Sequence, residues 1–368
     1  MATSDLCEYL KRRGTSGASG VNISATVSPF DQNTEKRVCA SVLKLLDDAS
    51  HDVQTIAVKT LSILLTSVHE DQVVEIAERL GNLLLDTSKG ELRDVYAIGL
   101  RTLVKTIPIE MGDRVSERLI VKLLVGIRGI PTNVEDKAIV KATGQITISS
   151  LEILADLVER FGALPHTCRQ QHIMVQATLS QLGSDSPAVR KRAGNTLGCL
   201  SVILEDTLLI QLVEILLAQI DASSVTRSQS TGRVTRNISK TQANVPSYQG
   251  LELSSLGTFM VADAKTLIRT MSTLSGAIGQ RLGQEQIDRI VPIFLKFCVP
   301  KDAVAGDDEV EGEEMDENAL ALINEIREGC FAGFQSFILR CHAFISPHLP
   351  NIIQSSLGML SSLTFICE

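Results

Sequence analysis

The side chains best suited to chemistry in this sequence are a short group of histidines and a cysteine. His166, Cys168 and His172 lie within seven residues, which suggests a metal ligand set or a nucleophile with its base. A structural zinc site needs four ligands at defined spacings, and no fourth ligand follows these three. Cys341 and His342 are neighbours, but a nucleophile and its base need a facing geometry that adjacency does not give. We therefore predict no catalytic residue and no metal site, and we interpret the group as a surface turn.

A glycine-rich stretch near the start, GTSGASG at 14–20, invites comparison with a phosphate-binding loop. It lacks the lysine of the GxxxxGK[ST] pattern, and no strand precedes it. We predict no cofactor site here and interpret residues 14–34 as a flexible loop.

Helices are the elements that must position any functional site. The chain has 368 residues, of which 44% are apolar and only 4% aromatic, and it contains no Trp. A core of Leu, Ile, Val and Ala favours helices packed on helices, because β-sandwiches draw on aromatic and β-branched residues. No segment alternates like a strand between hairpin turns. The composition therefore predicts an all-α protein.

The net charge of −8 is carried by one segment. Residues 301–317 contain nine acidic residues and one Lys, so the rest of the chain is neutral. Nucleic-acid binding requires a basic surface, which argues against that class of partner. We interpret 301–317 as a solvated acidic loop. A Ser/Thr-rich stretch at 223–250, with four basic residues and no acidic one, is predicted to be a disordered insert.

The sequence offers no convincing membrane segment. The N-terminus has no apolar run typical of a signal peptide, and the charge-free tail at 346–367 contains Pro, Asn, Gln and Ser. The eight cysteines are scattered without a CxxC pair and are interpreted as reduced thiols. We expect a soluble intracellular protein that is found in the cytoplasm and nucleus.

A repeated apolar pattern runs along the chain. Every second predicted helix has an apolar residue, then two anchors eight and eleven positions later, as in Val53, Leu61 and Leu64. A weaker copy has Leu274 and Ala277 as its anchors. The other copies begin at Leu92, Ile146, Val189 and Ile326, and their anchors are Leu100 and Leu103, Leu154 and Leu157, Leu197 and Leu200, and Phe334 and Phe337.

The spacing of the first anchors identifies the repeat class. They lie 39, 54, 43, 77 and 60 residues apart, and the three long intervals each contain a weakly hydrophobic insert, at 128–144, 223–250 and 301–317. Without these inserts the period is close to the roughly 40–47 residues of HEAT and armadillo arrays. Two helices per period favour HEAT. We predict a single array over 1–368, a right-handed α-solenoid of about six HEAT-like units, with an irregular α-bundle as the alternative.

Residues at the start of the repeated helices are the candidates for a partner surface. A basic residue follows the first apolar position in three copies, and it is predicted either to pair with an Asp of the preceding turn, such as Asp86 or Asp185, or to be an ordinary solvated residue. The predicted surface consists of Arg93, Asp94, Tyr96, Arg190, Lys191, Arg192 and Arg327. Because 1–13 and 349–361 each read as a single uncapped helix, we expect the chain to be part of a longer array.

Particular stretches resemble the N-terminal repeats of the cullin-associated, neddylation-dissociated protein family. The opening MATSDL resembles the start of that family's first repeat. The remaining similar stretches follow in the same order, at 35–61, 90–104, 151–162, 184–200, 279–298 and 334–353. The inserts at 14–34, 223–260 and 301–317 depart from the family.

The resemblance implies a function. Family members are HEAT solenoids that wrap cullin–RING ubiquitin ligases; their N-terminal repeats hold the cullin and its RING subunit and cover the lysine that receives the ubiquitin-like modifier. Their C-terminal repeats compete with the substrate adaptor, and some fungi encode the array as two chains. The resemblance therefore implies a non-catalytic regulator of cullin neddylation and ligase assembly, with a separate C-terminal half as a further expected partner. The alternative is another HEAT scaffold, such as a transport adaptor or a phosphatase scaffold.

Overall fold

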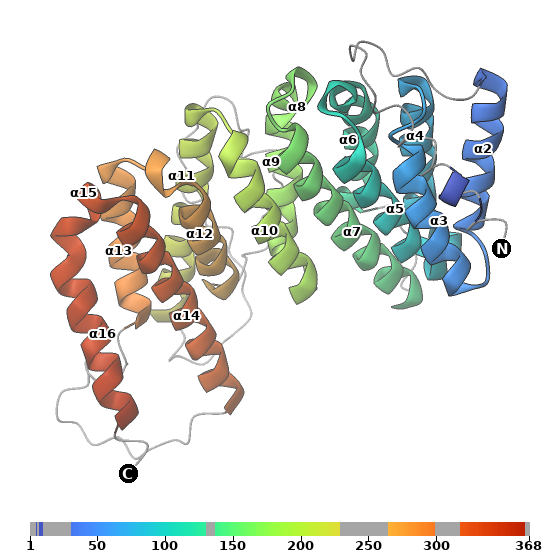
Figure 1. Ribbon diagram of the computed structural model, residues 1–368. Coiled ribbons are helices and arrows are strands. Elements are labelled where there is room, and N and C mark those ends of the chain that lie inside the picture. The colour runs from blue at the N-terminus through green and yellow to red at the C-terminus, as the bar shows by residue number, and fades with distance from the viewer. Residues whose placement is uncertain are drawn as a thin grey trace, which may run out of the picture. The chain divides into compact units, whose positions relative to one another are not determined.

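The computed structural model describes residues 5, 7–9, 31–129, 137–228, 264–298 and 317–364. Every regular element in these residues is a helix (Figure 1). The flexible loop predicted at 14–34 therefore lies largely outside the described residues, as do most of the inserts at 223–250 and 301–317. The chain divides into two compact units, Met1–Gln181 and Leu182–Glu368.

Unit 1 is built from helix pairs in chain order. Its α-helices are α2 (Gln32–Leu45), α3 (His51–Leu64), α4 (Glu70–Leu85), α5 (Arg93–Thr106), α6 (Gly112–Arg128), α7 (Lys137–Phe161), α8 (Pro165–Arg169) and α9 (Gln171–Ser180). Two 3-10 helices connect them, η1 (Thr87–Leu92) and η2 (Ile109–Met111). Helices α3, α5 and α7 pack in succession as one layer, and α2, α4, α6 and α9 pack in succession as the other.

Unit 2 repeats this arrangement after the 3-10 turn η3 (Gln181–Gly183). Its α-helices are α10 (Pro187–Ile203), α11 (Asp206–Ser228), α12 (Ala264–Ile278), α13 (Gln284–Cys298), α14 (Glu317–Arg340), α15 (His342–Ile345) and α16 (Leu349–Thr364), with η4 (Gly279–Arg281) and η6 (Ser346–His348) between them. Helices α10, α12 and α14 form one layer, and α11, α13 and α16 form the other. Two layers of stacked helix pairs are the arrangement of an α-helical repeat array.

The predicted anchors explain why the helices stack. The signature falls on α3, α5, α7, α10, α12 and α14, so it marks one layer in each unit. Ten of the anchors, such as Leu61, Leu100 and Leu197, are no more than 2% exposed. In the weaker copy Leu274 is buried while Ala277 is only half-buried. The prediction of an all-α helical repeat fold is thus confirmed.

Aromatic residues form a local core in unit 2. The rings of Phe294 in α13 and Phe334 in α14 meet edge to face with centroids 5.8 Å apart, and Phe337 lies 6.2 Å from Phe294. Gly333 makes this contact possible, because a Cβ at that position would overlap the Phe294 ring. Edge-to-face packing adds to the burial of these large side chains.

Three helices extend into segments that the sequence assigned to loops or inserts. Helix α2 begins at Gln32 because Asp31 caps it, accepting a hydrogen bond from the Thr34 N–H at 3.1 Å. Helix α7 begins at Lys137, within the 128–144 insert, and α11 continues to Ser228. Hydrophobic periodicity weakens at such helix ends, so it places boundaries less well than it places helices.

Candidate functional site

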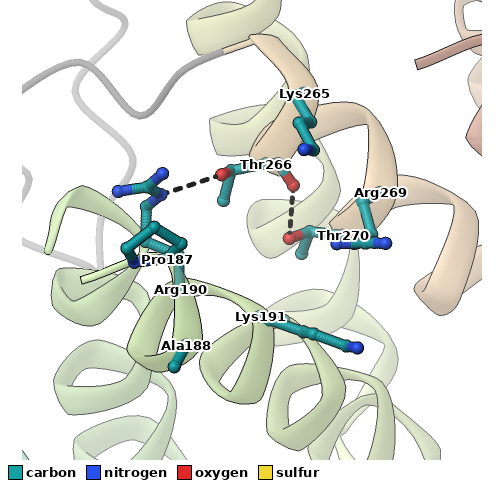
Figure 2. Close-up of a pocket in the computed structure, with 9 residues that line it drawn as sticks. Pro187, Ala188, Arg190, Lys191, Lys265, Thr266, Arg269 and Thr270 are labelled. Carbon is teal, nitrogen blue, oxygen red and sulfur yellow. Dashed lines mark hydrogen bonds between the residues drawn. The ribbon is translucent and has the colours of Figure 1, made fainter. Parts of the chain in front are cut away.

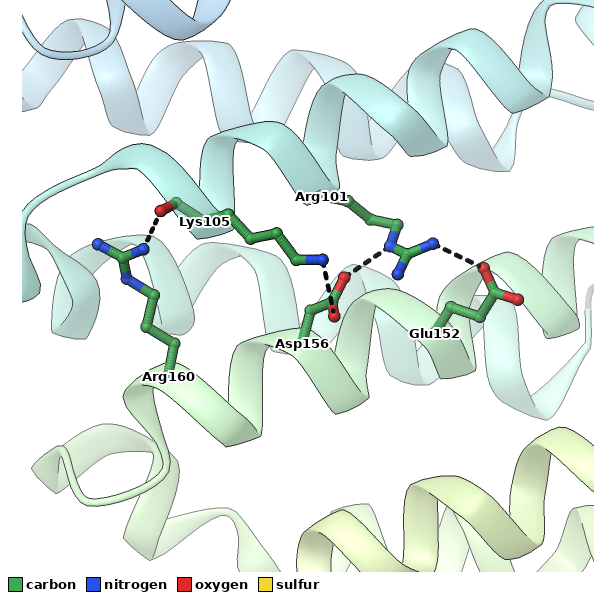
Figure 3. A network of polar contacts seen from close by, with 5 residues as sticks. All are labelled: Arg101, Lys105, Glu152, Asp156 and Arg160. Atoms are coloured by element: carbon green, nitrogen blue, oxygen red, sulfur yellow. Dashed lines mark hydrogen bonds and ion pairs between the residues drawn. The ribbon is translucent and has the colours of Figure 1, made fainter.

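Polar contacts join consecutive repeats in unit 1 and fix the helices that carry candidate residues. Arg101 of α5 donates from Nε to the Asp156 carboxylate of α7 at 2.6 Å, and its Nη1 lies 3.3 Å from a Glu152 oxygen (Figure 3). Lys105 reaches the other Asp156 oxygen at 3.5 Å, and Arg160 donates to the Lys105 backbone carbonyl. This network is a structural brace between α5 and α7.

Tyr96, one of the predicted surface residues, is buried. Its hydroxyl donates to Asp47 Oδ1 at 2.7 Å, and Lys89 pairs with Asp47 Oδ2 at 2.7 Å. Burial and the hydrogen bond to Asp47 raise the pKa of Tyr96 to about 12. Burial acts to raise the pKa of Asp47, but the hydrogen bonds from Lys89 and Tyr96 outweigh it and hold that pKa below its ordinary value. Tyr96 therefore stabilises the repeat and is unavailable to a partner.

Arg93 corrects the prediction in the same way. Only 3% of it is exposed, and its Nε and Nη2 atoms are buried without a hydrogen-bond partner. The predicted pairing with Asp86 is not formed. Burial lowers the pKa of Arg93, and the charges of Asp94 and Asp86 offset part of this effect. Asp94, its neighbour, is exposed.

Unit 2 gathers the strongest candidate site, a basic pocket between α10 and α12 (Figure 2). The pocket has a volume of about 210 Å³. Four of its lining residues are cations and none is acidic. We define the basic pocket by all nine lining residues: Pro187, Ala188, Arg190, Lys191, Gly194, Lys265, Thr266, Arg269 and Thr270.

Arg190 is held in place at this pocket. Its Nη1 donates to the backbone carbonyls of Ser184 at 2.8 Å and Asp185 at 3.2 Å, and its Nε donates to Thr266 Oγ1 at 3.2 Å. The predicted contact with the preceding turn therefore exists, but the backbone of Asp185 accepts it. Ser186 caps α10 and Pro187 occupies its first turn, as the sequence indicated.

The second helix of the pocket supplies residues that sequence reasoning missed. Lys265 and Arg269 are four positions apart in α12, so they lie on one face of that helix. Their spacing was the available signal, but the helix follows directly on an insert and its pattern is the weakest of the six copies. Gly194 lets α10 approach α12, because a Cβ there would lie 2.8 Å from Thr270 Oγ1.

The remaining predicted residues are not in the pocket lining. Arg192 is half-buried on α10, and Arg327 is half-buried on α14 with a buried Nε that has no hydrogen-bond partner. The structure thus brings together Arg190 and Lys191 from the predicted set, while Arg93, Asp94 and Tyr96 lie in the other unit.

The chemically suggestive His and Cys residues have structural contacts. The His166 N–H donates to Asp113 Oδ1 at 2.7 Å, and the Cys168 thiol donates to the Gly162 carbonyl. The Cys341 thiol donates to the Gly279 carbonyl at 2.7 Å, and burial raises its pKa, which disfavours the nucleophilic thiolate. In the described part of the chain, no group of three or more His, Cys, Asp or Glu side chains could hold a metal ion. Nor does any helix there have the length and apolar content needed to cross a membrane.

Comparison with known proteins identifies relatives. Mouse cullin-associated NEDD8-dissociated protein 2 is 27% identical over 354 residues, which is 96% of this chain and 22% of the mouse protein. Cullin-associated NEDD8-dissociated protein 1 of Arabidopsis thaliana is 26% identical over 98% of this chain, and that of Drosophila melanogaster is 27% identical over 90%. The chain is homologous to the cullin-associated NEDD8-dissociated proteins. This confirms the resemblance seen in the sequence.

The match to the cullin-associated NEDD8-dissociated proteins is partial in one respect. The chain spans about a fifth of the length of these relatives, although nearly all of the chain takes part in the alignment. No protein-family model matches the chain.

Proposed function

We propose that this chain is a non-catalytic regulator that binds a cullin and its RING subunit. The observation that carries the proposal is the alignment of relatives named cullin-associated over 88–98% of the chain. Homology along nearly the whole chain, in animals, a plant and Dictyostelium discoideum, favours a property of the array over one of a single motif.

The proposed mechanism is steric. Stacked helix pairs present a long surface, and a specific protein interface of standard size buries about 1,600 Å². An array seated on the cullin near the lysine that accepts the ubiquitin-like modifier would exclude the conjugating enzyme. Many dispersed contacts would supply the affinity, with Asp94, Arg190, Lys191, Arg192 and Arg327 as proposed contributors. No cofactor and no nucleic acid take part in this mechanism, which would operate where cullins are modified, in the cytoplasm and nucleus.

Ligase assembly and adaptor exchange form the second part of the proposal. Because the chain covers about a fifth of its relatives, we expect a separate chain carrying further repeats to complete the array on the cullin. The neddylation block needs only the present chain, whereas adaptor exchange needs that partner.

A binding comparison tests the proposal. The full chain is titrated against a purified cullin–RING complex that is either unmodified or already carries its modifier. We expect binding to the unmodified form and its loss in the modified form. Equal affinity for the two forms would overturn the steric mechanism, and no binding to either would reject cullin association. Capture of a phosphatase or a transport receptor instead would support the alternative scaffold function.

A further inference from the structure

The basic pocket between α10 and α12 has no role in the fold that accounts for its charge. We infer that it is a subsite that receives the carboxylates of an acidic segment of a protein partner. This inference rests on the proposed function, because it supplies the chemistry by which the array would recognise part of its partner.

The first argument is the contrast in charge between the pocket and the whole chain. The protein has 35 basic and 43 acidic residues, yet four cations and no acid line this one pocket of about 210 Å³. A chain with a net charge of −8 does not attract polyanions over its whole surface, so nucleic acid is a poor fit. A confined basic site instead fits a short acidic segment that inserts into it.

The second argument is the division of labour among the four cations. Arg190 is fixed by three donated hydrogen bonds, and Lys265 pairs with Glu325 of α14. Lys191 and Arg269 are exposed, and their side chains have no hydrogen bond or ion pair within the described residues. Two fixed cations provide a standing positive potential, while two open ones can bind a ligand carboxylate directly.

The third argument is geometric. Lys191 and Arg269 come from different helices, and Gly194 allows those helices to approach so that both cations border one pocket. The first turn of the 17-residue helix α10 adds the partial positive charge of its backbone N–H groups. An extended segment with two or more carboxylates can contact both helices, which a single small ion cannot do.

Charge reversal at the two open cations tests the inference. The full chain carrying K191E and R269E is compared with wild type for binding of a fluorescent octaglutamate peptide, measured by anisotropy at physiological salt. The control variant carries K59E and R118E, two exposed cations of unit 1, and therefore has the same net charge. We expect about a tenfold weakening in the pocket variant and little change in the control. Thermal unfolding checks that both variants remain folded.

The outcomes separate the alternatives. No binding of the peptide to wild type, or equal weakening in both variants, would overturn the inference. So would octathymidylate or inorganic phosphate competing as well as the peptide does, since the pocket would then be a phosphate site.

Repeating the comparison with an unmodified cullin–RING complex distinguishes this inference from the proposed function. If the pocket variant binds the complex as tightly as wild type, the inference fails while the proposed function stands. If wild type does not bind the complex, the proposed function fails, and the peptide result alone decides the pocket's chemistry.

Discussion

The carboxylate of Glu35 joins two consecutive outer helices by binding His69. Glu35 lies in α2 and is fully buried; one of its oxygens accepts the His69 backbone N–H at 2.6 Å, and the other lies 2.7 Å from the ring Nδ1. His69 directly precedes α4. A side chain of one repeat thus satisfies a backbone donor at the helix start of the next. The same relationship recurs between Asp113 of α6 and the N–H of His166 in α8.

Replacing Glu35 with Ala is expected to lower the free energy of unfolding of unit 1 by about 2–3 kcal/mol, because the variant leaves a buried donor without its charged acceptor. Urea unfolding followed by circular dichroism measures the change. The control is E117A, which removes an exposed carboxylate from α6. A loss equal to that of the control would show that the Glu35 contact contributes no stability.

Tyr96 is expected to make stability depend on alkaline pH. Its pKa is raised from 10.0 to about 12 in the folded chain, so the folded state retains a proton that the unfolded state releases above pH 10. The contribution of Tyr96 is therefore complete below pH 10 and is lost as the pH rises to about 12. Two pKa units correspond to about 2.7 kcal/mol.

The variant Tyr96→Phe tests this dependence. At neutral pH it is expected to be less stable than wild type by about 1.5–3 kcal/mol, since it loses a hydrogen bond to a carboxylate. The difference should shrink between pH 10 and 12. In an ultraviolet titration, one of the three tyrosines of wild type should ionise late, and that step should be missing in the variant. A constant difference in stability across this range would contradict the assignment.

Two glycines of unit 1 are expected to respond oppositely to replacement by alanine. A Cβ on Gly112 would lie 2.4 Å from Phe161 Cδ1, whereas a Cβ on Gly144 meets nothing within 4 Å. Because Phe161 is fully buried and cannot move freely, Gly112→Ala should cost about 1–3 kcal/mol. Gly144 lies inside α7, where alanine should stabilise by about 0.5–1 kcal/mol. Thermal melts of both variants measure the two signs, and a stabilising Gly112→Ala would contradict the packing described.

The apolar pattern carried much of the fold because it reports directly on burial. Leu61 and Leu64, or Phe334 and Phe337, recur at a spacing that only one helical face can bury, so the repeat and its helical class follow from periodicity. Charged and hydroxyl-bearing residues carry no such information. Tyr96 at a helix start reads equally well as exposed or buried, and only its contact with Asp47, 49 residues earlier, decides between them.

The sequence by itself determined that this protein is an all-α array of HEAT-like pairs with a neutral body, and it also determined the resemblance to cullin-associated proteins. These properties depend on local spacing and on residue order, which the chain carries without folding. Only the tertiary structure decided that Arg93 and Tyr96 are buried and that Lys191 and Arg269 border one pocket. The latter two residues are 78 positions apart with an insert between them. Their proximity follows from the packing of α10 on α12, which brings together side chains that no local pattern relates.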